Sequence, residues 1–271
     1  MSVKKILVTG SEGYIGRIIC PSLHVYGYDI SRYDLNFYQD IRDKEKVERA
    51  LEGHDAVIHL AAFPRPELGN IDYLGVNYHG SINVFEGAVK AGLKKMVFVS
   101  SGCVYGAWKG NIKPDQFPIK ENNYKPKLNV DNQTFYGHLK LEVEDYLRKN
   151  AEKNDIRCIS LRLELPGIRT SEKYTSNYFA QASIENVAQM FHLALSVDLE
   201  SYFEEFNVVD DYIPTLFMKE QKSQHMDIQK AIAENWPSVP NLTKGNESLW
   251  SCEKAKKLLG YKPIQNGTYD H

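Results

Sequence analysis

The chain has 271 residues, of which 33 are Lys or Arg and 35 are Asp or Glu, so its formal net charge is −2. Hydrophobic residues make up 42% and charged residues 25% of the chain, values typical of a globular protein that exclude global disorder. This near balance of charge gives no net field to attract nucleic acid or an anionic membrane. No apolar run reaches the roughly 18 residues of a membrane span, and no signal-peptide pattern occurs, so a cytoplasmic location is expected.

Cysteine and histidine spacing argues against disulfides and metal. Cys20, Cys103, Cys158 and Cys252 are far apart and form no C-x-x-C pair, which is typical of reduced thiols. The eight histidines form no H-E-x-x-H motif and no cluster with cysteine. We therefore expect no metal site.

Residues 1–166 alternate short apolar runs with helical patterns. Strands are predicted at 5–8, 24–29, 56–60, 96–99 and 158–163, and helices at 13–20, 44–51, 81–93 and 137–150. Pro21 is predicted to end the first helix and Asp43 to cap the second. Strands joined by helices indicate right-handed βαβ units, and continuous apolar strands indicate a sheet covered on both faces. The predicted fold is α/β, a doubly wound parallel sheet of the Rossmann type.

The last third is expected to return to this sheet once and then form a small lobe. A helix at 183–195 and a strand at 206–209 assign residues 183–212 to the sheet. Two more helices are predicted at 227–235 and 251–259, between polar, turn-rich stretches. Residues 167–182 and 213–271 are therefore predicted to form a small C-terminal lobe that binds the substrate.

A glycine-rich turn, Thr9-Gly10-Ser11-Glu12-Gly13-Tyr14-Ile15-Gly16, joins the first predicted strand to the first helix. Its three glycines permit a tight turn, close approach of the backbone to a pyrophosphate, and close helix packing. The helix N-terminus offers N–H groups and a positive dipole end to phosphates. The same glycines would also suit a strand-to-helix turn that binds nothing, so a second signal is needed.

An acidic residue after the second strand is that second signal, because it accepts hydrogen bonds from the adenosine ribose of a dinucleotide. Asp29 ends the predicted strand 24–29, and Asp34 is the rival a few residues later. The sequence favours Asp29, since Ser31-Arg32-Tyr33 resembles the loop beyond the strand. A carboxylate there repels a 2′-phosphate and favours NAD over NADP, although Arg32 could accommodate that phosphate.

A hydroxyl, a phenol and an amine form a candidate catalytic set. Tyr136 and Lys140 are four residues apart at the start of a predicted helix, so they lie on one face. A nearby ammonium favours the phenolate, which can exchange a proton with a substrate hydroxyl. Ser101 follows a predicted strand on the side where doubly wound sheets bind ligands, and can bind a substrate oxygen. The alternatives without a catalytic role are a Tyr–Lys pair on the surface and a serine that caps the end of the strand.

Together these motifs resemble the extended short-chain dehydrogenases/reductases, the group that contains NAD-dependent sugar epimerases and dehydratases. The matching residues, in the family's order, are Thr9-Gly10-x-x-Gly13-x-x-Gly16, Val25–Asp29, Asp40-Ile41, His59–Ala62, Asn77, Ser100-Ser101-x-x-Val104-Tyr105-Gly106, Tyr136-Gly137-x-x-Lys140 and Leu161-Arg162-x-x-x-Pro166.

The resemblance implies a role for each matching residue. Tyr136 would be the acid/base, Lys140 would tune it and hold the nicotinamide ribose, and Ser101 would bind the reacting oxygen. The implied cofactor contacts, besides Tyr136 and Lys140, are Gly10, Gly13, Tyr14, Ile15, Gly16, Asp29, Asp40, Ile41, Leu60, Ala61, Ala62, Asn77, Ser100, Leu163 and Pro166. A homodimer through the helices at 81–93 and 137–150 is also implied. Their second apolar stripes, Val84, Ala88, Leu141 and Val143, fit that interface or the core equally well.

The substrate is indicated by what the chain lacks. Only residues 167–182 separate Pro166 from Ser183, too few for the module that grips the nucleoside diphosphate in nucleotide-sugar enzymes of this family. In this respect the chain resembles the compact branch that includes uronate dehydrogenases. The expected function is hydride transfer between NAD and a sugar or sugar-acid carbinol. The alternatives are a nucleotide-sugar epimerase or dehydratase with tightly bound NAD, and a non-catalytic dinucleotide sensor.

Overall fold

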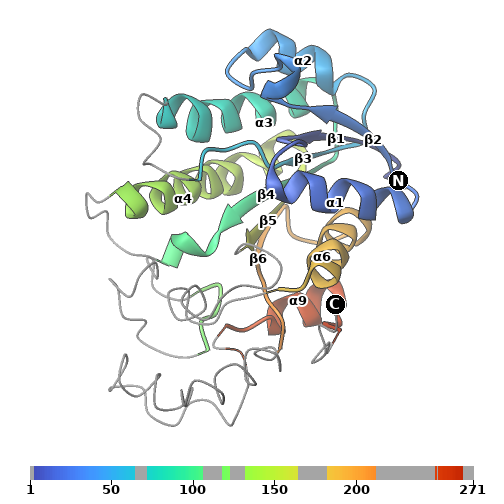
Figure 1. Ribbon diagram of the computed structural model, residues 1–271, viewed down its shortest axis with the longest axis vertical. Coiled ribbons are helices and arrows are strands. Elements are labelled where there is room, and N and C mark those ends of the chain that lie inside the picture. Colours follow the sequence, from blue (N-terminus) through green and yellow to red (C-terminus); the bar gives the residue numbers. More distant parts are fainter. Residues whose placement is uncertain are drawn as a thin grey trace.

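A six-stranded, wholly parallel sheet forms the centre of the fold, in the order β2-β1-β3-β4-β5-β6 (Figure 1). The computed structural model describes residues 3–64, 72–105, 118–122, 132–163, 182–211, 248 and 250–264. The strands are β1 (Lys5–Thr9), β2 (Asp29–Tyr33), β3 (Ala56–His59), β4 (Lys95–Ser101), β5 (Arg157–Leu163) and β6 (Phe203–Val208). The strand order changes direction at β1, which creates the switch point where doubly wound sheets bind ligands.

Helices cover both faces of the sheet (Figure 1). One layer holds α1 (Tyr14–Val25), α6 (Ile184–Ser196) and α9 (Glu253–Leu259), and the other holds α2 (Lys44–Leu51), α3 (Ser81–Lys90) and α4 (Asn132–Asn150). Alternate β1 side chains enter the two cores: Ile6 and Val8 pack with α1 and α6, whereas Leu7 packs with α2 and α3. The predicted doubly wound parallel sheet is confirmed.

Local capping signals were reliable predictors of helix starts. The Asp43 carboxylate accepts a hydrogen bond from the Lys46 backbone N–H at 3.1 Å, as predicted for the start of α2. Ser183 caps α6 in the same way, accepting from the Asn186 N–H at 3.1 Å. Both side chains satisfy N–H groups that have no partner within the helix. Helix α4 begins at Asn132, five residues before the predicted start at 137.

The predicted end of α1 is wrong. The helix continues through Pro21 to Val25, so the first residues of the predicted strand 24–29 are its last turn. Pro21 lacks the N–H that would bond the Arg17 carbonyl, and both residues lie on the exposed side of the helix. The buried stripe also continues past Pro21 to Leu23. Gly27, with φ +89°, then ends the helix, donating its N–H to the His24 carbonyl at 2.9 Å.

The chain beyond β5 returns to the sheet. Strand β6 pairs with β5, and α6 packs against α1. Helix α9 adds Ala255 and Leu259 to the same core. The predicted helix at 227–235 and most of the predicted substrate lobe lie outside the described residues. Among the helices that are described, none is long and apolar enough to cross a membrane.

Candidate active site

The glycine-rich turn packs closely against the backbone of neighbouring segments. Gly10 has φ +71°, and a Cβ there would lie 2.6 Å from the Ala61 nitrogen in the segment after β3. A Cβ on Gly16 would lie 2.5 Å from the Ser11 carbonyl oxygen. The turn is closed by the Gly13 N–H, which donates to the Gly10 carbonyl at 3.1 Å. The predicted reasons for glycine at these positions, a tight turn and close helix packing, are confirmed.

The first turn of α1 begins at a glycine. Gly13 occupies the N-cap position and makes no side-chain cap. The next two residues, Tyr14 and Ile15, are those predicted to meet the pyrophosphate. Beside them, the fully buried Ser11 hydroxyl has no hydrogen-bond partner in the described part of the chain. A buried polar atom without a partner at this turn fits a bound polar group.

The structure corrects the position of Asp29. It is the first residue of β2, paired with Lys5 at the amino end of the sheet, whereas the glycine-rich turn lies at the carboxyl end. Asp34 follows the carboxyl end of β2, and its Oδ2 accepts a hydrogen bond from the Glu12 N–H in the turn at 2.9 Å. The rival residue is therefore the acidic group beside the turn. The sequence pattern misplaces Asp29 because the last residues of α1 occupy the first part of the predicted strand 24–29.

A chain of buried hydrogen bonds fixes the wall of the site after β3. The His59 ring lies 2.6 Å from the Thr9 hydroxyl through Nδ1 and 2.9 Å from the Ser81 hydroxyl through Nε2. Because the Ser81 hydroxyl donates to the Asn77 carbonyl, it accepts from His59 Nε2–H, and Nδ1 must accept from Thr9. Burial and the nearby Lys140 cation lower the pKa of His59 to about 3, so this imidazole is neutral.

The same network orients the predicted cofactor-lining segment Leu60, Ala61 and Ala62. The Asn77 side chain bonds both backbone groups of Phe63, accepting from its N–H at 2.8 Å and donating to its carbonyl at 3.0 Å. Asn77 is fully buried in a π-helical turn, Gly75–Gly80, that leads into α3. Asn77 thus holds the segment that follows β3, the segment that is predicted to line the cofactor.

The Lys140 side chain is buried, with its ammonium near the Tyr136 ring. Its ammonium donates to the Val99 carbonyl at 2.7 Å and lies 5.7 Å from the centre of the Tyr136 ring. The Phe98 ring lies between Lys140, at 4.6 Å, and the His59 ring, at 5.9 Å. Burial lowers the pKa of Lys140 to about 7, although Glu144 and Cys103 oppose this effect. The predicted pairing of phenol and amine on one helix face is present in the structure.

The turn after Ser101 and the start of α4 are in close backbone contact. Ser101 ends β4, and its hydroxyl accepts a hydrogen bond from the Cys103 N–H at 3.1 Å. A Cβ on Gly137 would lie 2.3 Å from the Cys103 carbonyl oxygen, so α4 touches the short helix η3 (Gly102–Tyr105) directly. Glycine next to Tyr136 therefore permits this approach of α4 to the Ser101 turn.

Other predicted contacts are distributed around this edge of the sheet. Asp40 forms an ion pair with Arg42 at 2.6 Å, and this arginine lowers the pKa of the Asp40 carboxyl. Ile41 is buried beneath Gly80. Leu163 pairs with Ser101 at the ends of β5 and β4, and Ser100 is buried one residue earlier. Gly106 and Pro166 lie outside the described residues. The roles of these residues at the cofactor stay predictions.

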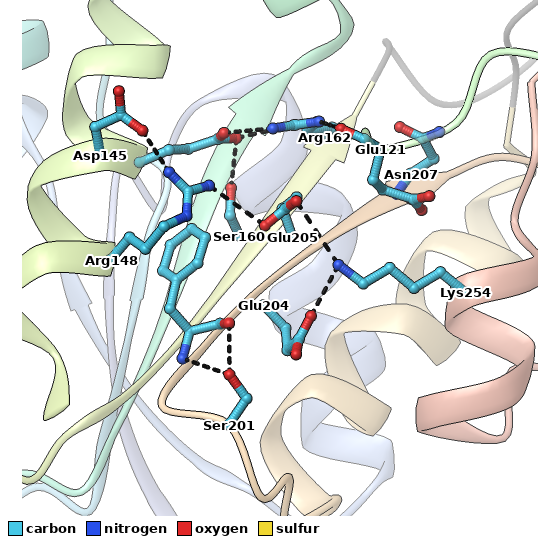
Figure 2. A network of polar contacts seen from close by, with 12 residues as sticks. Glu121, Asp145, Arg148, Ser160, Arg162, Ser201, Glu204, Glu205, Asn207 and Lys254 are labelled. Carbon is cyan, nitrogen blue, oxygen red and sulfur yellow. Dashed lines mark hydrogen bonds and ion pairs between the residues drawn. The ribbon is translucent and has the colours of Figure 1, made fainter. Parts of the chain in front are cut away.

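A buried ionic network behind Lys140 was not predicted. Arg162 on β5 binds both carboxylate oxygens of Glu144 on α4, at 3.1 and 2.6 Å, and both side chains are fully buried (Figure 2). Ser160 donates to the same carboxylate at 2.9 Å. Arg162 also donates to the Tyr105 hydroxyl at 2.8 Å and to the Glu121 carbonyl at 2.7 Å. Burial alone would raise the pKa of Glu144, but the Arg162 guanidinium lowers it.

Glu144 connects this network to the candidate site. It lies one helical turn after Lys140 and raises the pKa of that amine against the effect of burial. The spacing of four residues was a sequence signal for this contact. No local signal identified Arg162 as its partner, because the pair joins a helix to a strand. Among the described residues, no cluster of His, Cys, Asp or Glu could hold a metal ion.

The chain is similar in sequence to a known protein family. The pattern of the NAD dependent epimerase/dehydratase family matches residues 6–200. L-arabinose 1-dehydrogenase (NAD(P)(+)) of Haloferax volcanii is 35% identical over 277 aligned positions, which cover 97% of each chain. A UDP-glucose 4-epimerase of Azospirillum brasilense is 29% identical over 177 positions, which cover 58% of this chain and 48% of the epimerase.

A solved structure of similar fold is the uronate dehydrogenase of Agrobacterium tumefaciens. It superposes with a TM-score of 0.68 at 18% identity, covering 98% of this chain and 86% of that protein. At this identity the likeness concerns the fold.

Proposed function

Because the chain belongs to the NAD-dependent epimerase/dehydratase family, we propose that it is an NAD-dependent dehydrogenase of a free sugar or sugar acid. Sequence identity over the whole chain carries this proposal. The chain is 35% identical to L-arabinose 1-dehydrogenase over 97% of both lengths, and 30% identical to a UDP-glucose 4-epimerase of Lacticaseibacillus casei over 95% of this chain and 91% of that epimerase. The short stretch 167–182, too short for a nucleoside diphosphate module, also favours a free sugar.

The residues at the carboxyl edge of the sheet fit a dinucleotide. The glycine-rich turn lies where a pyrophosphate would be bound, at the N-terminus of α1. The Ser11 hydroxyl, which has no partner among the described residues, belongs to the same turn. Asp34 is positioned to accept from the adenosine ribose, and Lys140 to hold the nicotinamide ribose. Bound NAD would supply the hydride acceptor. The segment held by Asn77 would line the cofactor along β3.

The proposed contact between Asp34 and the adenosine ribose gives a prediction on the affinity for NAD. Replacing Asp34 with Ala should raise the Kd for NAD by about tenfold or more, because a hydrogen bond to a charged group contributes about 1.5–3 kcal/mol. Titration calorimetry measures this directly. Asp34→Asn, which keeps an acceptor for the Glu12 N–H, separates ribose binding from the turn's own geometry. Asp29→Ala is the matched control, and an equal loss of affinity in that variant would contradict the assignment to Asp34.

The reaction would use the three predicted side chains in distinct ways. The Ser101 oxygen already accepts from the Cys103 N–H, so its own proton can be donated to the substrate oxygen. That hydrogen bond orients the carbinol and steadies charge on its oxygen. Tyr136 takes the hydroxyl proton as the hydride leaves the carbon. The Lys140 cation favours the phenolate, and the Val99 carbonyl and the Phe98 ring hold its ammonium below the phenol.

The low pKa of Lys140 predicts the pH dependence of this step. The proposed base is the form of the Tyr136 and Lys140 pair that has lost one proton. Because burial lowers the pKa of Lys140 to about 7, kcat/KM for oxidation should rise with pH up to about 7 and then level off. In Lys140→Met only the phenol remains, and a phenol ordinarily has a pKa near 10, so the rise should move to higher pH. An unchanged profile in Lys140→Met would contradict the pairing.

A substrate panel tests the proposed activity. We expect stoichiometric NADH from the full chain with NAD and free aldoses or uronic acids, followed by absorbance, and none with UDP-glucose. An epimerase on a nucleotide-sugar is the second candidate, favoured by the match to UDP-glucose 4-epimerase. It would return the hydride to the sugar and give a UDP-sugar epimer without net NADH. Chromatography of the sugar products separates the two, and the second result would overturn the dehydrogenase proposal.

The oligomer and the location stay predictions. A homodimer through α3 and α4 follows from the family resemblance alone, because Val84, Ala88, Leu141 and Val143 are buried within the protomer. The cytoplasmic location rests on the sequence pattern. Their apolar character is explained by the core. Light scattering of the purified chain measures the oligomeric state.

A further inference from the structure

Four charged side chains gather at the carboxyl end of β2 beside the glycine-rich turn. Arg32 faces Glu12, with Nη1 2.6 Å from Oε1. Arg17, in the first turn of α1, approaches the same carboxylate, with Nε 3.8 Å from Oε2. Asp34 accepts from the Glu12 backbone N–H at 2.9 Å. The turn thus holds one carboxylate, Glu12, between two arginines, and a second carboxylate, Asp34, against its backbone.

Glu12 is the more enclosed partner of this ion pair. Its side chain is 17% exposed, whereas that of Arg32 is 43% exposed. A guanidinium that already donates to a carboxylate has fewer donors left for another anion, and the carboxylate itself repels that anion. Arg32 would otherwise be well placed for a phosphate, because it lies two residues before Asp34 and a guanidinium binds phosphate through paired N–H groups.

We propose that Glu12 determines the preference for NAD over NADP by holding Arg32 away from the 2′ position of the adenosine ribose. This inference rests on the proposed placement of that ribose at Asp34. The 2′-phosphate of NADP meets the Asp34 carboxylate, the Glu12 carboxylate, and an arginine already paired with Glu12. The ribose hydroxyls of NAD need only an acceptor, which Asp34 provides. The selectivity for NAD over NADP therefore depends on the Glu12–Arg32 ion pair as well as on Asp34.

Glu12→Gln tests this role with little change in shape. The substitution removes the charge but keeps the side-chain length and the backbone N–H that bonds Asp34. We expect the Kd for NADP to fall by about tenfold or more, the effect of one hydrogen bond to a charged group, and the Kd for NAD to change by less than about threefold. Titration calorimetry of the full chain with each nucleotide measures both. The gain for NADP should shrink at high salt, because it depends on exposed charges.

The double variant Glu12→Gln/Arg32→Gln identifies the group that receives the phosphate. If released Arg32 binds the 2′-phosphate, the gain seen in Glu12→Gln disappears in the double variant. A gain that persists there would overturn the role of Arg32. Arg17→Gln in the Glu12→Gln background is the matched control, since Arg17 lies farther from the carboxylate, and should leave most of the gain.

Failure of this inference can be told from failure of the ribose placement. If Glu12→Gln leaves the Kd ratio of the two nucleotides unchanged while Asp34→Ala weakens NAD binding, the ribose is correctly placed and Glu12 does not select the cofactor. If Asp34→Ala leaves the affinity for NAD unchanged, the placement itself is wrong, and the inference falls with it.

Discussion

Replacing Tyr136 with Phe should reduce kcat for sugar oxidation by about 100- to 10,000-fold, the usual contribution of a general acid or base. The variant lacks a single oxygen, so nothing else on α4 has to move. The Kd for NAD should change little, because the ring and the Lys140 ammonium beneath it remain. A large loss of kcat with intact cofactor binding is the signature of a proton-transfer group.

A matched substitution on the same helix controls for stability. Tyr146 also lies on α4, where its hydroxyl donates to Glu86 at 3.2 Å, away from the candidate site. Tyr146→Phe should leave kcat unchanged. If Tyr136→Phe retains full turnover on a sugar that wild type oxidises, Tyr136 is not the base. A dinucleotide sensor would then be the reading to pursue, provided the variant still binds NAD.

Local sequence signals predicted most elements of the fold. Buried parallel strands are short apolar runs, and the strand at 56–60 was recognised on that basis alone. The cap at Asp43 marked the start of α2 because one side chain satisfies an N–H group of that helix. The position of Ser101 at the end of β4, and of Tyr136 and Lys140 on one face of α4, could be predicted because these relations depend only on nearby residues.

Contacts between distant segments could not be predicted. Pro21 is a local signal for a helix end, yet the buried stripe of α1 continues past it to Leu23. Strand β2 therefore begins only at Asp29, and Asp34 is the acidic residue that follows it. Glu144 lies in a helix with several other charged residues and Arg162 in a largely apolar strand, and nothing in the sequence shows that the two side chains meet. A buried charge is stable only with its partner, so such a pair is visible only once the elements are packed.

Removing Arg162 should have the largest effect on stability. Arg162→Met leaves the Glu144 carboxylate buried without its bidentate partner, at a cost of about 3–5 kcal/mol in the free energy of unfolding. Urea denaturation followed by circular dichroism measures it. Arg148, which contacts Asp145 and Glu205 on the exposed side of α4, is the control (Figure 2). Arg148→Met should cost no more than about 1 kcal/mol, because exposed ion pairs contribute little.

The pH dependence separates an unpaired carboxylate from a simple packing defect. In wild type, Arg162 lowers the pKa of Glu144, so this pair stabilises the fold above the ordinary carboxyl pKa. In Arg162→Met, burial without a partner raises the pKa of Glu144, and the folded state then binds more protons than the unfolded state. The free energy of unfolding of the variant should therefore decrease as pH rises from about 5 to 7, relative to wild type.

The double variant Arg162→Met/Glu144→Met completes the test. With both charges gone, most of the lost stability should return, since a buried ion pair replaced by apolar residues of similar volume is often neutral. The Tyr105 hydroxyl keeps its bond to Asn207 at 2.8 Å, whereas Ser160 and the Glu121 carbonyl each lose a partner. If the double variant is less stable than Arg162→Met and shows no pH difference, the pair acts through its shape and hydrogen bonds, and the uncompensated charge is not what destabilises the single variant.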